Sequence, residues 1–281
     1  IEGQTLVPYR ADYRCNWLQV LDAILDPIHT SFLHSRMSRA QFSEGMGEIG
    51  ELLFYQREMS FLGANVRRVD EHVWVRVNEL VLPNYTQAGA AFSADGTRAI
   101  YYGRTAFSRW VVPIDDENST AFAWAIFGER ADPEEYNTPE GPELIEQGER
   151  MDRSYDQRQR FPGDAEAVEG MGHIADQKLE HLVPSDKGII QYRKKLRKLC
   201  RDLESGTGPA HVTDFLPNPV ATYGGDTVLK IDEDATDDGR RLIEIGEKVM
   251  HAQFDAEALT GLERVETVID TLKSLEAEFC T

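Results

Sequence analysis

The chain has 281 residues, and its 49 acidic and 30 basic side chains give it a formal net charge of −19. This length is enough to bury a substantial core, as one large domain or two modest ones. So acidic a surface repels nucleic acid and anionic membranes, and no apolar run reaches the roughly 18 residues that a membrane span needs, so we expect neither as a partner. Three scattered cysteines and the lack of a signal pattern favour a cytoplasmic protein.

The first predicted element is a helix, because apolar residues recur at helical spacing over residues 15–25. It ends at Asp26 and Pro27, and a second short helix follows. Proline has no backbone N–H to donate, so Pro27 is expected at the first helical position, with Asp26 before it as the N-cap. His29 then lies in the first turn and His34 in the second.

The middle of the chain shows the alternation that is typical of strands. Segments rich in β-branched and aromatic residues are separated by turn residues, which predicts an antiparallel meander. The predicted strands are 66–69, 73–77, 100–102, 110–114 and 121–127, with a polar turn over 115–119 between the last two.

The remaining segments divide the chain into three predicted parts. Residues 131–149 are rich in Pro, Gly and Glu and are expected to form a surface loop, whereas 186–203 have the pattern of an amphipathic helix. Residues 206–240 are linker-like. Two further helices are expected over 241–253 and 256–279. We therefore predict one domain over 1–205, a linker over 206–240 and a C-terminal helical extension over 241–281.

His29 and His34 are candidate metal ligands. Two neutral imidazoles can bind one ion, but a separation of five residues places them roughly 140° apart around an ideal helix. The usual spacing for such a pair is four. The pair therefore requires a frayed or widened helical turn, or ring rotations that converge on the ion.

The segment around these histidines resembles the mononuclear iron site of the Rieske non-haem iron oxygenases, where Asn-Trp-x-Gln leads into Asp-x-x-His-x-x-x-x-His. Every fixed position of that pattern is present here, as Asn16, Trp17, Gln19, Asp26, His29 and His34. Segments 110–116 and 160–186 are also similar to the family, in the same order along the chain. The resemblance covers roughly residues 9 to 203 and is closest to the phthalate-dioxygenase-like branch.

The resemblance implies a two-histidine, one-carboxylate set that binds Fe(II) through His29, His34 and Asp164. Three positions on one face of the ion would stay open, where O2 and the substrate meet. Asp164 is the expected carboxylate, although a Gly precedes it where many relatives have Gln. Asp152 and Asp156 are the alternatives if Asp164 points away from the histidines.

The resemblance also implies a catalytic role for Asp26, as the link between an iron-binding histidine and a cluster-binding histidine of a neighbouring subunit. The working unit would then be a homo-oligomer, expected to be a trimer. The alternative for Asp26 is a plain N-cap ahead of Pro27. Asn16 and Asp22 are expected to orient the ligands.

The fold implied by the resemblance is an α+β helix-grip fold of the START/SRPBCC type, with an antiparallel sheet curved around helices. Residues 1–205 would be its catalytic mononuclear-iron domain. A Rieske [2Fe–2S] cluster requires Cys-x-His and Cys-x-x-His, and this chain has neither. The cluster is therefore expected from a missing N-terminal domain or from a partner chain.

The implied activity is that of a terminal oxygenase component, which hydroxylates, dihydroxylates or O-demethylates a small aromatic substrate with O2. Electrons from NAD(P)H would arrive through a reductase, with or without a ferredoxin. The alternative is a metal-free module of the same fold that binds a hydrophobic ligand. Zinc hydrolysis with the same three ligands is a further, weaker alternative.

Overall fold

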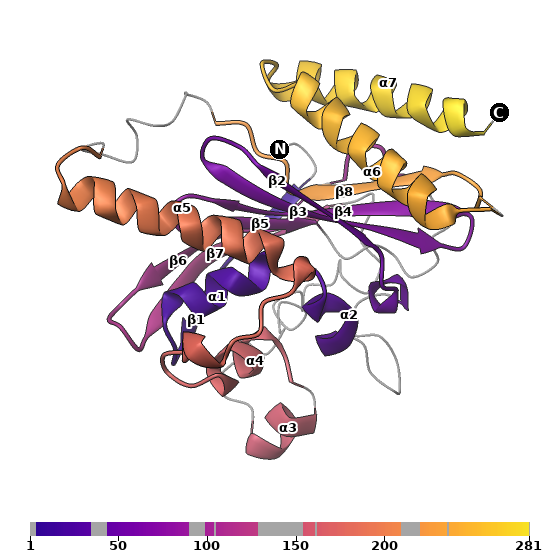
Figure 1. Ribbon diagram of the computed structural model, residues 1–281. Coiled ribbons are helices and arrows are strands. Elements are labelled where there is room, and N and C mark those ends of the chain that lie inside the picture. The colour runs from indigo at the N-terminus through magenta and orange to yellow at the C-terminus, as the bar shows by residue number, and fades with distance from the viewer. Residues whose placement is uncertain are drawn as a thin grey trace.

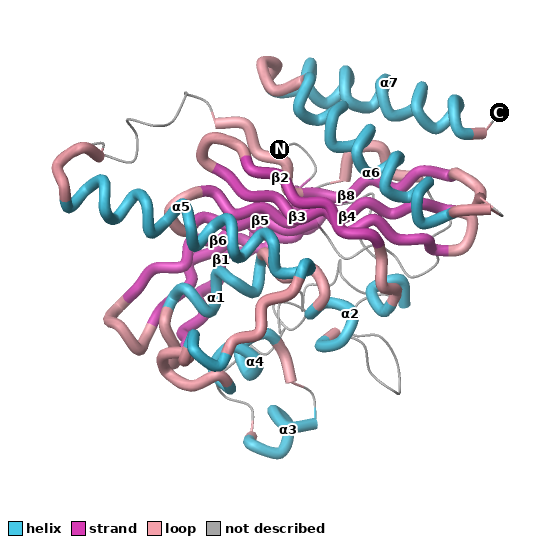
Figure 2. Tube along the Cα trace, in the orientation of Figure 1, coloured by secondary structure: helices cyan, strands magenta, loops and turns pink. Residues whose placement is uncertain are grey.

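An antiparallel sheet of eight strands forms the centre of the computed structural model (Figures 1 and 2). The structure describes residues 4–34, 44–89, 99–103, 105–128, 154–160, 162–208, 220–234 and 236–280. The strand order is β1-β7-β6-β5-β4-β3-β2, and β8 also pairs with β4. The strands are β1 (Gln4–Tyr13), β2 (Glu51–Gln56), β3 (Ser60–Val69), β4 (His72–Val81), β5 (Tyr85–Gly89), β6 (Thr105–Pro113), β7 (Ser119–Gly128) and β8 (Gly225–Lys230). This arrangement confirms the predicted α+β class with an antiparallel sheet.

Helices cover both faces of this sheet (Figure 1). One face carries α1 (Trp17–Ile24), α2 (His29–Leu33), α4 (Asp164–Gly170) and α5 (Lys187–Glu204), and the other carries α6 (Asp238–Asp255) and α7 (Gly261–Phe279). The shorter elements are α3 (Tyr155–Arg160), η1 (Glu44–Gly47), η4 (Gln177–Leu179) and η5 (Pro184–Asp186). We call the first face the site face and the second the α6/α7 face.

Alternation along β3 and β4 separates the two faces. Leu62, Ala64 and Val66 point to the α6/α7 face and join a cluster with buried residues of α6 and α7. Phe61 and Leu80 point the other way and pack with buried residues of α1 and α5. Each face of the sheet therefore has its own apolar core, because successive side chains of a strand lie on opposite faces.

The helices were predicted better than the strands. Helices α1, α5, α6 and α7 match the four long predicted helices, with small shifts at their ends. Strands β1, β2 and β5 were not predicted, and segment 100–102 contributes a single bridge, from Ile100 to Val228. The predicted loop over 131–149 lies outside the described residues.

The linker-like interpretation of residues 206–240 is wrong for part of the segment. Residues Gly225–Lys230 form β8, which pairs with β4 over six positions, from Gly225 opposite Val77 to Lys230 opposite His72. A short strand that pairs with a central strand gains its stability from tertiary contacts, so its local composition does not reveal it. The division into domains at 205 and 240 stays a prediction.

No helix of the described residues is long and apolar enough to cross a membrane.

Candidate metal centre

His29 and His34 lie at the two ends of α2, a helix of only five residues. The helix ends at Leu33, and His34 follows it with φ −95° and ψ 1°. The prediction that Pro27 occupies the first helical position is wrong, because α2 begins two residues later. Asp26 still caps this turn: its Oδ1 accepts the backbone N–H of Ile28 at 2.9 Å and that of His29 at 3.2 Å. A helix this short lets the two histidines converge despite their separation of five residues.

Three side chains of the sheet hold the segment that carries these histidines. Asn78 of β4 donates to the carbonyl of Ile24 at 3.2 Å. Arg67 of β3 donates to the Thr30 hydroxyl at 2.8 Å, and Asn65 of β3 lies 3.5 Å from the carbonyl of Pro27. Buried polar groups of this kind fix position, because leaving them unpaired is costly.

Asp164 is the first residue of α4, and Gln19 of α1 holds that helix in place. The Gln19 amide donates to the carbonyls of Val168 and Gly172, each at 2.9 Å, and accepts the N–H of Ala175 at 3.0 Å. A glutamine of the sequence motif thus positions the carboxylate that lies 145 residues further along the chain.

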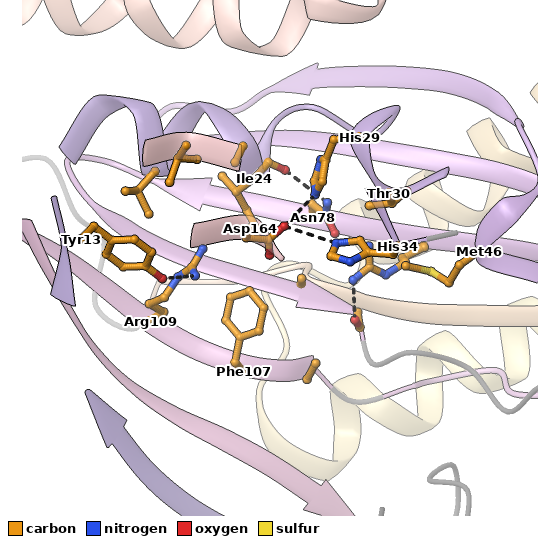
Figure 3. A pocket seen from close by; sticks show the side chains of 17 residues that line it. Tyr13, Ile24, His29, Thr30, His34, Met46, Asn78, Phe107, Arg109 and Asp164 are labelled. Atoms are coloured by element: carbon orange, nitrogen blue, oxygen red, sulfur yellow. Dashed lines mark hydrogen bonds and ion pairs between the residues drawn. The ribbon is translucent and has the colours of Figure 1, made fainter. Parts of the chain in front are cut away.

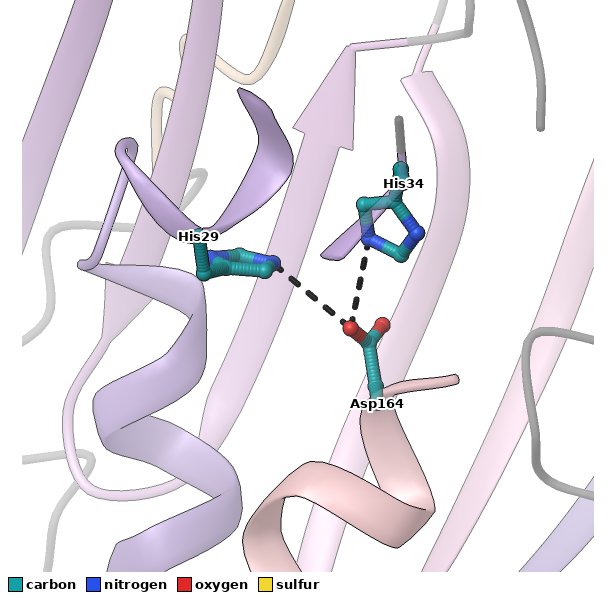
Figure 4. Close-up of side chains that lie close together, drawn as sticks. All are labelled: His29, His34 and Asp164. Carbon is teal, nitrogen blue, oxygen red and sulfur yellow. Dashed lines mark ion pairs between the residues drawn. The ribbon is translucent and has the colours of Figure 1, made fainter. Parts of the chain in front are cut away.

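The three predicted ligands meet at one point (Figure 4). Oδ1 of Asp164 lies 3.3 Å from Nε2 of His34 and 3.6 Å from Nε2 of His29. Two atoms that each lie about 2.1 Å from an ion are roughly 3.0–3.6 Å apart for angles of about 90–120° at the ion. The two distances from Asp164 therefore fit a single ion. The nearest ligand atoms of all three residues lie within 4.8 Å of one another.

The charge states of these residues also suit a cation. Burial opposes the ionisation of Asp164, but His34, His29 and Arg109 outweigh it and hold the pKa of this carboxyl well below its usual range. Burial lowers the pKa of His29 and so favours the neutral imidazole, which is the form that binds metals. Oδ1 of Asp164 is buried and has no hydrogen-bond donor among the described residues. An ionised oxygen in that position fits a bound cation.

The outer nitrogen of His29 is also fixed. Its Nδ1 contacts the backbone carbonyl of Asp26, so Nδ1 carries the proton and Nε2 faces Asp164. The acceptor is the main chain of Asp26, whereas the Asp26 carboxylate caps the turn.

The other predicted site residues lie further out. Asn16 caps α1 by accepting the N–H of Leu18 at 3.0 Å. Asp22 binds Arg193 of α5, with a shortest distance of 2.5 Å. Their predicted roles in orienting the ligands stay predictions. Asp156 is exposed on α3 and pairs with Arg160, away from the cluster, and Asp152 lies outside the described residues.

Two cavities adjoin the three ligands, and His29 and Asp164 line both. The inner cavity lies over the sheet and has a volume of about 60 Å³. Figure 3 shows Phe107 and Arg109 at one side of Asp164, and His34 at the other. The outer cavity has a volume of about 330 Å³ and is lined by Asp26 together with residues of α1, α4 and α5.

Comparison with known proteins supports the sequence resemblance, although the search against protein-family models finds no match. The chain is 34% identical over 243 residues to the tert-butanol monooxygenase / tert-amyl alcohol desaturase oxygenase subunit of Aquincola tertiaricarbonis, covering 80% of this chain and 49% of that one. It is 29% identical over 210 residues to the phenoxybenzoate dioxygenase subunit alpha of Ectopseudomonas oleovorans, covering 73% and 46%. The chain belongs to the Rieske-type oxygenase family. It is also 28% identical over 232 residues to the 5,5'-dehydrodivanillate O-demethylase oxygenase subunit of a Sphingobium strain, covering 77% and 50%.

The chain spans about half the length of these Rieske-type oxygenase subunits. The likeness therefore identifies the family of this part of the protein and does not extend to the remaining half of those subunits.

The structure of this Rieske-type oxygenase chain adds site residues that the sequence analysis did not identify. Arg76, Asn78, Phe107 and Arg109 line the inner cavity. The available signal was the presence of Arg76 and Asn78 at alternate positions of a mostly apolar strand. Polar residues spaced by two within a buried strand share one face and have to be paired there.

Proposed function

We propose that this chain is the catalytic part of a terminal oxygenase, in which His29, His34 and Asp164 hold one mononuclear Fe(II). The observation that carries the proposal is the convergence of these three side chains, which come from α2, its C-terminal end and α4. Two neutral nitrogens and one carboxylate are the donor set of mononuclear non-haem iron oxygenases. The proposed reaction is hydroxylation, dihydroxylation or O-demethylation of an aromatic compound.

The ferrous ion, when bound, supplies the activation of O2. The residues of the chain prepare the site for it: burial lowers the pKa of His29, the neighbouring histidines and Arg109 lower that of Asp164 despite burial, and the sheet holds the α2 segment in place. No fourth His, Cys, Asp or Glu of the described residues joins the cluster. That leaves room at the ion for a substrate and O2, whereas a structural zinc site would use four protein ligands.

The inner cavity is the proposed substrate side of the ion. Its apolar wall includes Val20, Ala88 and Phe107, which suits an aromatic or aliphatic group. A volume of about 60 Å³ accommodates roughly four water molecules, so a ring-sized substrate enters only when lining side chains move.

The outer cavity is the proposed side of electron entry. Asp26 and His29 both line it, and His29 touches the main chain of Asp26. We propose that Asp26 connects the iron site to a Rieske [2Fe–2S] cluster carried by another domain or subunit, in a trimer. NAD(P)H would supply the electrons through a reductase, with or without a ferredoxin, in the cytoplasm.

The relatives support an oxygenase without defining the substrate. Their names refer to tert-butanol, phenoxybenzoate and dehydrodivanillate, which differ in size and charge. The proposed substrate class of this chain, an aromatic compound, therefore rests on the lining of its own inner cavity.

Replacement of Asp164 tests the proposal. In Asp164→Ala we expect the iron content to fall from about one per chain to near zero after anaerobic reconstitution, with loss of product formation. Asp156→Ala is the matched control, since Asp156 is an exposed carboxylate outside the cluster, and it should keep both. Full iron content in Asp164→Ala would refute the proposed ligand set.

The metal-free ligand carrier is not favoured. A carrier needs a cavity the size of its ligand, typically about 300–1,000 Å³. The inner cavity is far smaller, whereas the outer cavity of about 330 Å³ reaches the lower end of this range. Three converging metal-binding atoms beside both cavities, however, have no use in such a carrier. The same measurement of iron content separates the two functions.

A further inference from the structure

Met46 of η1 is a buried methionine beside the candidate metal centre. Its side chain is 1% exposed, and it lines the inner cavity together with His34 and Asp164. Figure 3 shows it on the side of Asp164 where His34 lies. Met46 carries the only sulfur among the described residues that line this cavity.

The sulfur of Met46 is held next to α2. Nη1 of Arg67 donates to Sδ of Met46 at 3.4 Å, and Nη2 of the same guanidinium donates to the Thr30 hydroxyl at 2.8 Å. Thr30 follows His29 in α2 and lines the same cavity. Because the guanidinium is planar and rigid, it fixes the sulfur beside the helix that begins with a ligand.

A thioether is chemically suited to accept oxygen. Methionine takes up one oxygen atom to become methionine sulfoxide, and the rest of the side chain stays intact. A side chain that lines the cavity of an O2-activating ion meets the oxidant whenever no substrate is present to consume it. The position of Met46 therefore exposes its sulfur to the chemistry of the site, although the side chain is shielded from solvent.

Arg67 can accommodate the oxidised side chain. Its Nε has no acceptor among the described residues, and sulfur is a weak acceptor for its Nη1. A sulfoxide oxygen on Met46 would be a stronger acceptor for the same guanidinium. Met250, by contrast, is buried in the apolar cluster of the α6/α7 face, where an added polar oxygen is unfavourable.

We propose that Met46 is an internal oxygen acceptor of the iron site, converted to methionine sulfoxide when no substrate occupies the inner cavity. This inference rests on the proposed function, since it requires a redox-active ion at His29, His34 and Asp164. With hydrogen peroxide as the oxidant, the O–O bond breaks and an S–O bond forms at Sδ. The sulfur loses two electrons, and the second oxygen leaves with both protons as water.

Peptide mass mapping after exposure to stoichiometric hydrogen peroxide tests this inference on the full chain in three forms: loaded with Fe(II), loaded with Zn(II) and metal-free. Zn(II) can bind the same three ligands but has no redox chemistry. We expect at least tenfold more sulfoxide at Met46 in the Fe(II) form than in the other two. Met171, which is 52% exposed, should be oxidised in all three forms because it meets the peroxide from solvent, and Met250 in none.

Two variants connect the oxidation to the ligand set. Asp164→Ala, treated with Fe(II) in the same way, should lose the sulfoxide at Met46 and keep that at Met171. Asp156→Ala is the matched control and should behave like the wild type, because Asp156 is exposed and lies outside the cluster.

The outcomes separate this inference from the proposed function. An Fe(II) form that retains its metal but leaves Met46 unoxidised would overturn the inference while the proposed function stands. Equal oxidation of Met46 in all three forms would also overturn it, since the oxygen would then come from peroxide in solution without the iron. A chain that retains no Fe(II) would refute the proposed function and this inference with it.

Discussion

The two faces of the same sheet have different tasks in this protein. On β3 and β4 the α6/α7 face presents mainly Leu, Ala and Val, which pack against α6 and α7. The site face of the same strands presents Asn65, Arg67, Arg76 and Asn78, which hold the histidine segment or line the inner cavity. Each strand thus packs one set of alternate residues against α6 and α7, and several residues of the other set support the proposed iron site.

This separation has a physical basis. Polar side chains in a core are tolerated only where each finds a partner, and they then fix the position of what they bind. The apolar face provides the free energy of folding through burial. Substitutions of polar residues on the site face should therefore change turnover more than the free energy of unfolding. Substitutions on the α6/α7 face should change the free energy of unfolding more than turnover.

Apart from the loss of Asp164, the largest expected effect on the site side is that of Asp26→Asn. Asparagine can still accept the N–H groups of Ile28 and His29, so the turn should survive, but the negative charge is lost. We expect NADH-driven turnover of the complete oxygenase to fall about 100-fold, roughly 2.7 kcal/mol. Iron content and peroxide-supported product formation should not change. If NADH-driven turnover is retained, Asp26 is only a cap.

On the opposite face, Gly246→Val should reduce stability. A Cβ at Gly246 would lie 2.5 Å from Cγ2 of Val66 and 2.8 Å from Cδ1 of Leu53, so any larger side chain pushes α6 away from the sheet. We expect a loss of about 1–3 kcal/mol in the free energy of unfolding, measured by urea denaturation. The iron content of the folded protein should not change.

Gly170→Val is the control for this substitution, because no atom lies within 4 Å of a Cβ built at Gly170. Valine has a higher helix propensity than glycine, so this substitution should change the free energy of unfolding by less than about 1 kcal/mol. Equal losses in the two variants would show that α6 is not tightly packed on the sheet.

Glu79 is a charged exception on the α6/α7 face, and it predicts a dependence of stability on pH. It accepts the N–H groups of Tyr223 at 2.6 Å and Gly224 at 3.1 Å, and burial raises its pKa from 4.5 to about 7. The folded protein therefore binds this proton more tightly than the unfolded chain does. The resulting stability is fully present below about pH 4.5 and is lost as the pH rises through about 7.

Glu79→Gln keeps an acceptor for both N–H groups and removes the titration. We expect its Tm to exceed that of the wild type by several degrees at pH 8, and the difference to vanish near pH 4.5. Thermal unfolding followed by circular dichroism at several pH values measures this difference. A constant difference across that range would contradict the raised pKa.

The smallest expected effect is that of Phe107→Ala, which enlarges the inner cavity. Phe107 lines the cavity, and its ring lies 4.8 Å from the guanidinium carbon of Arg109. We expect kcat/KM to rise a few-fold for bulky substrates relative to small ones, a shift below about 1.4 kcal/mol. Relative rates for a series of substituted benzoates provide the measurement. An unchanged preference would show that Phe107 does not limit the space for substrate.

The sequence by itself determined the long helices and offered His29 and His34 as candidate ligands. Residues 15–25 and 186–203 have apolar residues at helical spacing, and such local periodicity is retained in the fold. His29 and His34 belong to one short motif, but a separation of five does not by itself make them converge, and the early end of α2 at Leu33 does. Asp164 was suggested by resemblance to a family, since nothing local to its segment links it to α2.

Only the tertiary structure decided what surrounds the ligands. Strand β8 pairs with β4 across about 150 residues of chain, and its linker-like composition gave no sign of this. Gln19 holds α4, and Arg76 faces the cavity, because strands and helices that are distant in sequence pack together. A sequence shows which residues can bind a metal, but the packing of the whole chain decides which of them share a cavity.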